Sequence, residues 1–276
     1  MAGRGDPTPV AAVIGSPVGH SRSPAIHTAA FSASGLNWVY LAFDVAVPHV
    51  ASAVGGAAAL GFRGLSVTMP LKTVIVEVLD ELTDTARTLG AVNTVTFTAG
   101  RSVGDNTDGA GFLRAVEAAT GWQAGRQATA VIGAGGAARA VILALAGAGA
   151  TSVAVINRDE RRAGAAARLG GSAGRIGGPD DITGAALVVN ATPVGMSGTP
   201  MAGEIALDPS LLRPDQIIVD LVYHPVETPL ITAARARGAT AVDGLGMLVH
   251  QAALQFELWT GLTAPIAQMC AAARES

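Results

Sequence analysis

Lysine is nearly absent from this 276-residue chain, which has 17 arginines and a single lysine, Lys72, among its 18 Lys and Arg residues. Guanidinium and ammonium groups replace one another where only a surface charge is needed, but not at special sites. A lysine retained in such an arginine-biased sequence is therefore a candidate functional residue. Its accidental survival is, on composition alone, an equally good explanation.

Cysteine and charge are also scarce. Cys270 stands alone and cannot form an internal disulfide or a cysteine-based zinc site, which favours a reducing compartment. Only 14% of the residues are charged and half are hydrophobic, which excludes a disordered chain. The net charge of −3 without basic runs argues against nucleic-acid binding. The longest apolar stretch, residues 140–150, is too short to span a bilayer. We expect a cytoplasmic globular protein with neither nucleic-acid nor membrane partners.

Short apolar runs alternate with helix-like stretches along the chain, which is typical of an α/β fold with mainly parallel sheets. Strands are predicted at residues 10–14, 38–43, 64–68, 92–97, 128–132, 153–156, 187–189, 217–220 and 240–242. A final helix, at about 247–259, is expected to pack back on the first domain. Residues 171–179 are predicted to form a loop. We place one domain at residues 1–107 and 244–276, and the other at 108–243.

A glycine-rich turn follows the predicted strand at 128–132. It consists of Gly133, Ala134, Gly135, Gly136 and Ala137 and fits the pattern G-x-G-x-x-[G/A], with an apolar helical stretch after it. Glycine permits the tight turn and a close backbone approach, and the N-terminus of the helix attracts a pyrophosphate. The turn therefore predicts a Rossmann-like dinucleotide-binding domain.

The end of the next strand indicates which dinucleotide binds. An NAD site usually has Asp or Glu there to hold the ribose 2′-hydroxyl, whereas here Asn157 and Arg158 come first. Arg158 and Arg162 suit a 2′-phosphate, which favours NADP. Asp159 places a carboxylate beside the expected phosphate and keeps NAD as an alternative. Equally, Asp159 marks only the start of a solvated helix, where acidic residues are favourable.

Three polar segments of the first domain follow predicted strands or border them, and strand ends are where open parallel sheets bind ligands. The first contains Ser21 and Ser23, the second Thr68 and Lys72, and the third Asn93. Two hydroxyls this close together suit a substrate carboxylate. Ser23 taken alone also fits a helix N-cap before a proline.

Further motifs complete a set that runs in order through residues 10–262. They are Gly15-x-Pro-x-x-His-Ser-x-Ser-Pro-x-x-His27, Val67-Thr-x-Pro-x-Lys72, Gly90-Ala-Val-Asn-Thr94, Asn106-Thr-Asp-Gly109, Gly133-Ala-Gly-Gly-Ala137, Asn190-Ala-Thr-Pro-Val-Gly-Met196, Asp220-Leu-Val-Tyr-x-Pro225, Thr228-Pro-Leu230 and Gly244-Leu-Gly-Met-Leu248 with Gln251. The set closely resembles the shikimate dehydrogenase family. Thr28 and Asp159 depart from it, because the family usually has Asn at the first position and NADP-dependent members have Thr or Ser at the second.

The resemblance implies an N-terminal α/β substrate domain, a Rossmann-like NADP domain and an active site in the cleft between them. The implied reaction is the reversible NADPH-dependent reduction of 3-dehydroshikimate to shikimate, a step of aromatic amino-acid biosynthesis. The family's catalytic pair maps onto Lys72 and Asp108. An ammonium group stabilises the alkoxide formed by hydride transfer and donates a proton to it, which a guanidinium cannot do. Asp108 would orient Lys72 and accept from a neighbouring substrate hydroxyl.

The same resemblance assigns the remaining site residues. Substrate binding falls to Ser21, Ser23, Thr68, Lys72, Asn93, Asp108, Tyr223 and Gln251. Cofactor binding falls to the glycine-rich turn with Asn157, Arg158, Asp159, Arg162, Thr192, Met196, Leu221, Gly244 and Met247. The two methionines are equally well explained as core residues. No metal is expected, since no ligand spacing links the histidines His20, His27 and His250, which we interpret as structural.

Two other functions remain open at this stage. One is an NAD-dependent quinate/shikimate dehydrogenase, which fits Asp159, although a serine at position 23 favours shikimate over the more hydroxylated quinate. The other is a non-catalytic dinucleotide-binding paralogue, which would be expected to lose Lys72 or Asp108. The chain is expected to act on a small molecule as a monomer or a homodimer.

Overall fold

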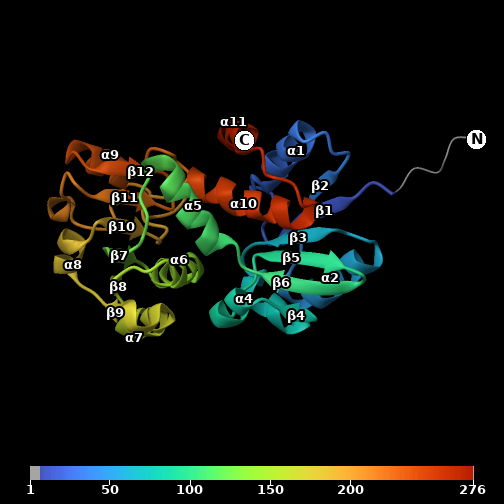
Figure 1. Ribbon diagram of the computed structural model, residues 1–276, viewed down its shortest axis with the longest axis horizontal. Coiled ribbons are helices and arrows are strands. Elements are labelled where there is room, and N and C mark those ends of the chain that lie inside the picture. The colour runs from blue at the N-terminus through green and yellow to red at the C-terminus, as the bar shows by residue number, and fades with distance from the viewer. Residues whose placement is uncertain (1–6, 276) are drawn as a thin grey trace, which may run out of the picture. The chain divides into compact units, whose positions relative to one another are not determined.

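The structure is a computed structural model that describes residues 7–275, and the chain forms two compact units, each with its own six-stranded sheet (Figure 1). The first unit runs to Thr107 and resumes at Ala252, and the second is Asp108–Gln251. The second boundary lies inside helix α10 (Leu245–Thr260), not at residue 244 as placed from the sequence. One unbroken helix is shared between both units, so no loop composition marks the change.

The first unit combines parallel and antiparallel strands. Its elements are β1 (Val10–Gly15), α1 (Ser23–Ala33), β2 (Val39–Asp44), η1 (Val47–His49), α2 (Val50–Ala59), β3 (Gly64–Val67), α3 (Leu71–Val74), η2 (Ile75–Val78), β4 (Glu81–Leu82), α4 (Asp84–Leu89), β5 (Thr94–Thr98), β6 (Arg101–Asp105) and, after α10, α11 (Ile266–Glu275). The sheet order is β2-β1-β3-β5-β6-β4. β1 pairs in parallel with β2 and β3, and β5 pairs antiparallel with β3 and β6, beside which it lies in Figure 1.

Both faces of this sheet are covered, which explains the continuous apolar run of β1. Successive side chains of a strand point to opposite faces. Ala12 and Ile14 belong to a core with Val50 and Val54 of α2. The intervening Val13 is also buried, so it faces the opposite layer.

The second unit is a doubly wound parallel sheet. Its elements are α5 (Asp108–Thr120), β7 (Ala128–Ile132), α6 (Gly136–Gly147), β8 (Ser152–Ile156), α7 (Glu160–Ala167), η3 (Arg168–Ala173), β9 (Gly174–Ile176), α8 (Pro179–Gly184), β10 (Leu187–Asn190), η4 (Pro209–Leu211), β11 (Ile217–Asp220), α9 (Pro229–Ala236) and β12 (Thr240–Val242). The order β12-β11-β10-β7-β8-β9, all parallel, is that of a Rossmann fold. The loop predicted at residues 171–179 is wrong in part, because β9 adds an edge strand through pairing with β8.

Helices cover both faces of the second sheet as well. Val131 and Val189 pack with Val141 of α6 and Phe112 of α5, while Ile218 lies in a separate core. That second core takes its helical side chains from α8 and α9.

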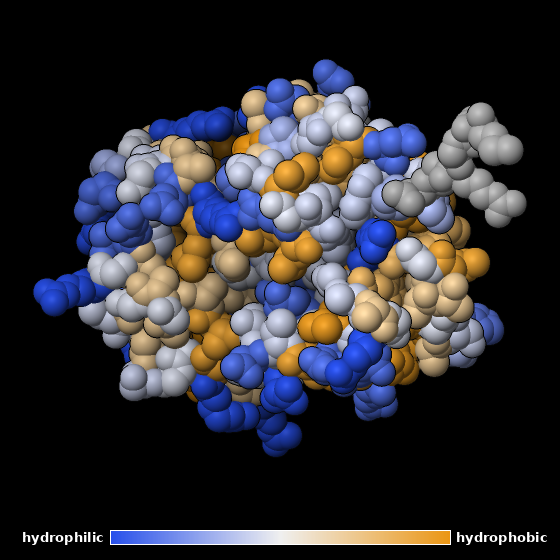
Figure 2. Space-filling view, turned by 45° about the vertical axis from the view of Figure 1, so that its right-hand side comes forward, coloured by the Kyte–Doolittle hydropathy of each residue, from blue (hydrophilic) through white to orange (hydrophobic). Residues whose placement is uncertain are grey.

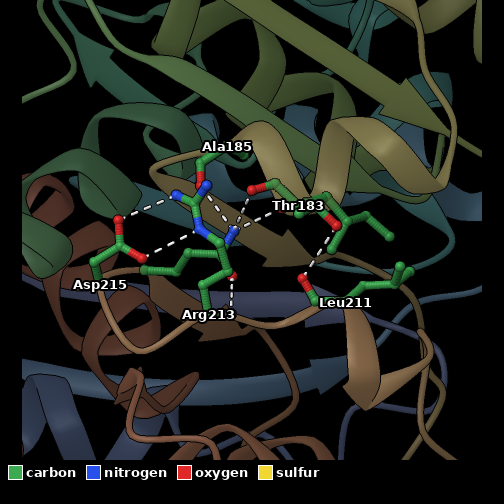
Figure 3. Close-up of polar contacts among 7 residues, drawn as sticks. Thr183, Ala185, Leu211, Arg213 and Asp215 are labelled. Carbon is green, nitrogen blue, oxygen red and sulfur yellow. Dashed lines mark hydrogen bonds and ion pairs between the residues drawn. The ribbon is translucent and has the colours of Figure 1, made fainter.

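A buried glutamine secures the end of α8 in this unit. The side-chain Nε2 of Gln216 donates to the backbone oxygens of Ile182 (2.6 Å) and Ala185 (2.8 Å), and its Oε1 accepts from the backbone N of Arg213 (2.8 Å). These contacts belong to the cluster drawn in Figure 3. Carbonyls at a helix C-terminus lack hydrogen-bond donors within the helix, and the Gln216 amide donates to two of them here.

The surface is mixed. Figure 2 shows hydrophobic side chains interspersed with hydrophilic ones over one face. Among residues 7–275, no helix combines the length and apolar character that crossing a membrane requires.

Candidate active site

Two loops of the first unit meet at the carboxyl ends of β1 and β3. The backbone N of Ser16 donates to the oxygen of Met69 (3.0 Å), and that of Thr68 donates to the oxygen of Ile14 (3.0 Å). Only glycine fits at position 15, since a Cβ there would lie 2.8 Å from the Met69 oxygen. This close approach brings the serine-containing loop after β1 beside the segment that carries Thr68.

The backbone of Lys72 is hydrogen-bonded to the segment before β5. It lies in α3 with its side chain half-buried, and its backbone oxygen accepts from the N of Val92 (2.8 Å). The N of Val67 in turn donates to the oxygen of Asn93 (2.8 Å). Thr68, Lys72 and Asn93 therefore share one edge of the sheet.

Asn93 connects this edge to the start of α5. Its Oδ1 accepts from the backbone N of Thr107 (2.8 Å), and its Nδ2 donates to the Thr107 Oγ1 (3.0 Å). The next residue, Asp108, is buried and begins α5, where a carboxylate is favoured by the helix dipole. β5 begins at Thr94, so Asn93 precedes the strand and is not inside it as predicted. Its backbone N donates to the oxygen of Asp105 (3.0 Å), and its backbone oxygen accepts from the N of Val67 (2.8 Å).

The two serines take different positions. Ser21 lies in the loop, and its Oγ accepts from the backbone N of Ser23 (3.3 Å). Ser23 is buried as the first residue of α1, and Arg22 holds the N-cap position without a side-chain cap. The N-cap alternative for Ser23 is therefore wrong, because its side chain hydrogen-bonds Tyr40 instead of a helix N–H.

The remaining substrate-site residues predicted from the sequence lie in the second unit. Tyr223 follows β11, and Gln251 lies in α10 with its Nε2 donating to the Leu248 oxygen (2.8 Å). Gly111 of α5 lets α10 approach closely, since a Cβ there would lie 2.6 Å from the Gln251 N. Their part in substrate binding stays a prediction.

The glycine-rich turn lies where the strand order of the second sheet reverses, between β7 and β10. Gly133 has φ +118°, which disfavours other residues, and a Cβ there would lie 2.9 Å from the oxygen of Ala191. Dinucleotides bind at such a reversal in open α/β sheets. Gly133 is thus required both by its backbone conformation and by the loop after β10.

The N-terminus of α6 is open above this turn. Gly135 is its N-cap and offers no side-chain cap, and a Cβ at Gly135 or Gly136 would meet no atom within 4 Å. Backbone N–H groups at a helix start lack partners within the helix and carry partial positive charge. The residues present therefore fit the pyrophosphate of a dinucleotide.

Thr192 is held by a buried polar cluster at the ends of β10 and β11. Its Oγ1 donates to the Asn190 Oδ1 (2.6 Å), and the Asn190 Nδ2 donates to the Asp220 Oδ1 (2.9 Å). Asp220 also accepts from the Thr228 Oγ1 (2.7 Å). Burial raises the pKa of the Asp220 carboxyl, partly offset by these hydrogen bonds. The cluster fixes the loop that carries Thr192 against the glycine-rich turn.

The Asp159 carboxylate caps α7. Its Oδ1 accepts from the backbone N of Arg161 (2.9 Å) and of Arg162 (3.2 Å), while Asn157 Nδ2 donates to its backbone oxygen (3.0 Å). Arg158 is exposed beside it. The helix-start explanation therefore accounts for the position of Asp159, and two amides partly neutralise its charge.

The other predicted cofactor residues lie at several places in the second unit, and their part in cofactor binding stays a prediction. Gly244 packs against the end of β11, because a Cβ there would lie 2.8 Å from the Val222 oxygen. Met247 packs against the core around α5 and α6, which favours the core explanation for it. Met196 and Leu221 are half-buried in loops after β10 and β11. Within residues 7–275, no three His, Cys, Asp or Glu side chains gather in a metal-binding group.

Sequence reasoning missed the buried polar side chains behind this site. Tyr40, Ser66, Thr94, Thr107 and Gln255 are all buried and hydrogen-bonded to one another or to Asn93. The signal available was Gln255 itself, a polar residue four positions after Gln251 in an apolar helix. Its partners are distant in sequence, so no local pattern could identify them.

The chain resembles enzymes of one family throughout its length. A family model described as the shikimate dehydrogenase substrate binding domain matches residues 13–95, and one described as the shikimate 5'-dehydrogenase C-terminal domain matches residues 244–274. The chain is 46% identical to a shikimate dehydrogenase (NADP(+)) of Moorella thermoacetica, over 98% of this chain and 94% of that protein.

Solved structures give the same result. The shikimate 5-dehydrogenase from Thermus thermophilus, in complex with NADP(H) and shikimate, is 39% identical with a TM-score of 0.88, over 97% of this chain and 99% of that one. A quinate dehydrogenase from Corynebacterium glutamicum in complex with NAD is 36% identical with a TM-score of 0.89, over 98% and 99%. Motifs, fold and relatives agree, and the chain belongs to the shikimate dehydrogenase family.

Proposed function

We propose that this protein catalyses the reversible NADPH-dependent reduction of 3-dehydroshikimate to shikimate. The observation that carries the proposal is the link from Lys72 through Asn93 to the residue preceding Asp108, at the carboxyl ends of the first unit's strands. Both members of the family's catalytic pair are present, which argues against a non-catalytic paralogue. The names of the relatives at 46% and 39% identity support the same reaction.

The proton chemistry falls to Lys72. Reduction of a carbonyl leaves an oxygen that must be protonated as its negative charge develops, and an ammonium group supplies both charge and proton. Asp108, at the first position of α5, is suited to orient that ammonium and to accept from an adjacent substrate hydroxyl. In the reverse reaction the Lys72 amine takes back the proton of the substrate hydroxyl, and Asp108 keeps its orienting role.

The proposed substrate-binding residues form two sets, according to the substrate group that each set would bind. Ser21, Ser23 and Tyr223 are suited to hold a carboxylate through their hydroxyls, and Thr68, Asn93 and Gln251 to hydrogen-bond ring hydroxyls. Polar groups matched to substrate hydroxyls reject analogues that lack them, because those groups would be left unpaired. This explains why so polar a set stands in a chain with only 14% charged residues.

NADP fits the second unit. The glycine-rich turn and the open start of α6 suit its pyrophosphate, and Arg158 and Arg162 suit its 2′-phosphate. When bound, NADPH supplies the hydride. Thr192, held by Asn190, is positioned on the neighbouring loop after β10.

Steady-state rates with shikimate and quinate, each with NADP and NAD, test the proposal. We expect the highest kcat/KM with shikimate and NADP, exceeding the quinate value by about tenfold or more, since quinate adds a hydroxyl that the site must accommodate. If quinate with NAD had the highest kcat/KM, the proposed function would be wrong.

An NAD-dependent quinate/shikimate dehydrogenase is the second candidate, favoured by the Asp159 carboxylate and by the likeness to a quinate dehydrogenase in complex with NAD. Asp159→Thr removes the charge and keeps a capping hydroxyl, so we expect NADP to bind roughly fivefold tighter, the effect of about 1 kcal/mol between exposed charges. Titration of NADP and NAD gives both Kd values.

Asp159→Ala serves as the control for the cap. It removes charge and cap together, so NADP should tighten similarly while the free energy of unfolding falls by about 1 kcal/mol. An unchanged Kd for NADP in both variants would show that Asp159 does not face the 2′-phosphate.

We also propose that the protein acts in the cytoplasm as a monomer or a homodimer. Its single cysteine, Cys270, fits a reducing compartment. Light scattering of the purified chain measures the assembly directly.

A further inference from the structure

A chain of buried hydrogen bonds joins the two ends of the candidate substrate site in the first unit. Starting from Ser23, which hydrogen-bonds Tyr40, the Tyr40 hydroxyl donates to the Ser66 Oγ (2.6 Å). The Ser66 hydroxyl then donates to the Gln255 Oε1 (2.6 Å). All four side chains are at most 8% exposed.

The chain continues from the other end of the Gln255 amide. Its Nε2 donates to the backbone oxygen of Asn93 (3.1 Å) and to the Thr94 Oγ1 (3.0 Å). The Thr94 hydroxyl donates to the Asn93 Oδ1 (2.7 Å). Gln255 therefore holds the main chain of Asn93 directly and its side chain through Thr94.

The orientation of the Gln255 amide is determined by its partners. The Asn93 carbonyl only accepts, so the nitrogen of the amide must face it and the oxygen must face Ser66. A side chain that is 1% exposed and makes these bonds has one rotamer available, since any other leaves buried polar groups unpaired.

We propose that Gln255 is a positioning residue, which sets the spacing between Ser23 and Asn93 and so the fit of the substrate between them. The inference rests on the proposed function, in which Ser23 holds the carboxylate and Asn93 a ring hydroxyl. Gln255 lies on α10, far from both in sequence, and acts through Ser66 and Tyr40 on one side and through Thr94 on the other.

Gln255→Met tests this role, because it keeps the approximate length of the side chain and removes its donors and acceptor. A displacement of binding groups by about 1 Å costs up to ~10²-fold in rate constants. We expect the KM for shikimate to rise about tenfold or more, with the KM for NADP within twofold of the parent value. Ser66→Ala interrupts the same chain with a smaller change and should raise the shikimate KM in the same direction.

Gln216→Met is the matched control. Gln216 is also a fully buried glutamine with several hydrogen bonds, but these secure α8 in the second unit. It should lower the Tm and leave both KM values within twofold.

Two results would overturn the positioning role. One is a shikimate KM within twofold of the parent in both Gln255→Met and Ser66→Ala, each folded as judged by its Tm. The other is an equal rise of the shikimate KM in Gln216→Met, which would indicate general loosening. Failure of the proposed function is separate, because the parent protein itself would then not oxidise shikimate with NADP.

Discussion

Replacing Lys72 by alanine is expected to lower kcat for shikimate oxidation at least ~10²-fold, the usual contribution of a general acid–base group. The main chain of Lys72 is held at the sheet edge by the bond from the Val92 N to its backbone oxygen, which the substitution leaves intact. NADP binding should persist, because the residues proposed to bind the nucleotide belong to the second unit. Steady-state kinetics and a separate titration of NADP measure the two effects.

Lys72→Arg separates charge from proton transfer. Arginine keeps a positive charge and hydrogen-bond donors but does not give up a proton at accessible pH. We expect its kcat to stay at least ~10²-fold below the parent value. Its KM for shikimate should rise less than that of the alanine variant. A Lys72→Ala protein that kept most of its kcat would remove Lys72 from the mechanism.

The second large expected effect is acid destabilisation through His27. Its ring is completely buried and stacked on Tyr40, with centroids 4.4 Å apart. Because the Gln255 Oε1 accepts hydrogen bonds, the His27 Nε2 at 3.3 Å carries the proton, and within the described residues the Nδ1 has no hydrogen-bond partner. Burial lowers the pKa of His27 from 6.5 to about 3, partly opposed by the bond to Gln255.

The sign of the effect follows from this lowered pKa. Between pH 6.5 and about 3 the unfolded chain binds a proton at His27 that the folded chain does not. The contribution of the neutral His27 to the free energy of unfolding is fully present above pH 6.5. It is lost as the pH falls towards 3, by about 1.4 kcal/mol per pH unit. Summed over that pH range, the loss is a large fraction of the roughly 5–15 kcal/mol that stabilises a typical domain.

The free energy of unfolding in urea, measured from pH 7 down to pH 4.5, checks this prediction. His27→Gln cannot titrate and should flatten the decline in acid, even if it is less stable at pH 7. His49→Gln, at an exposed histidine, is the control and should decline like the parent. If the His27→Gln and parent curves ran parallel, protonation of His27 would not be what destabilises the fold.

Local patterns were enough for most of the architecture. β7, β11 and β12 have the bounds predicted from apolar runs, and the other predicted strands differ by one or two residues at one or both ends. The pattern succeeded because strands buried on both faces are continuous apolar runs between turn residues. It failed at β4, β6 and β9: β4 and β9 have only two and three residues, β6 carries Arg101 and Asp105, and all three are defined by pairing with neighbours.

The functional residues divide in the same way. The sequence by itself determined which residue types are available for the proposed chemistry: one lysine, an aspartate at a helix start, and a glycine-rich turn before an apolar helix. These depend on residue type and short spacing, which a sequence displays directly. They also carried the resemblance that identified the family.

Only the tertiary structure decided how those residues are held. Whether Asp159 caps α7 depended on where its side chain points, and the structure shows its Oδ1 accepting from the amides of Arg161 and Arg162. The support of Asn93 by Gln255 joins residues 162 positions apart. Hydrogen bonds within a buried core depend on distances in space, so such partners become visible only when the chain is folded.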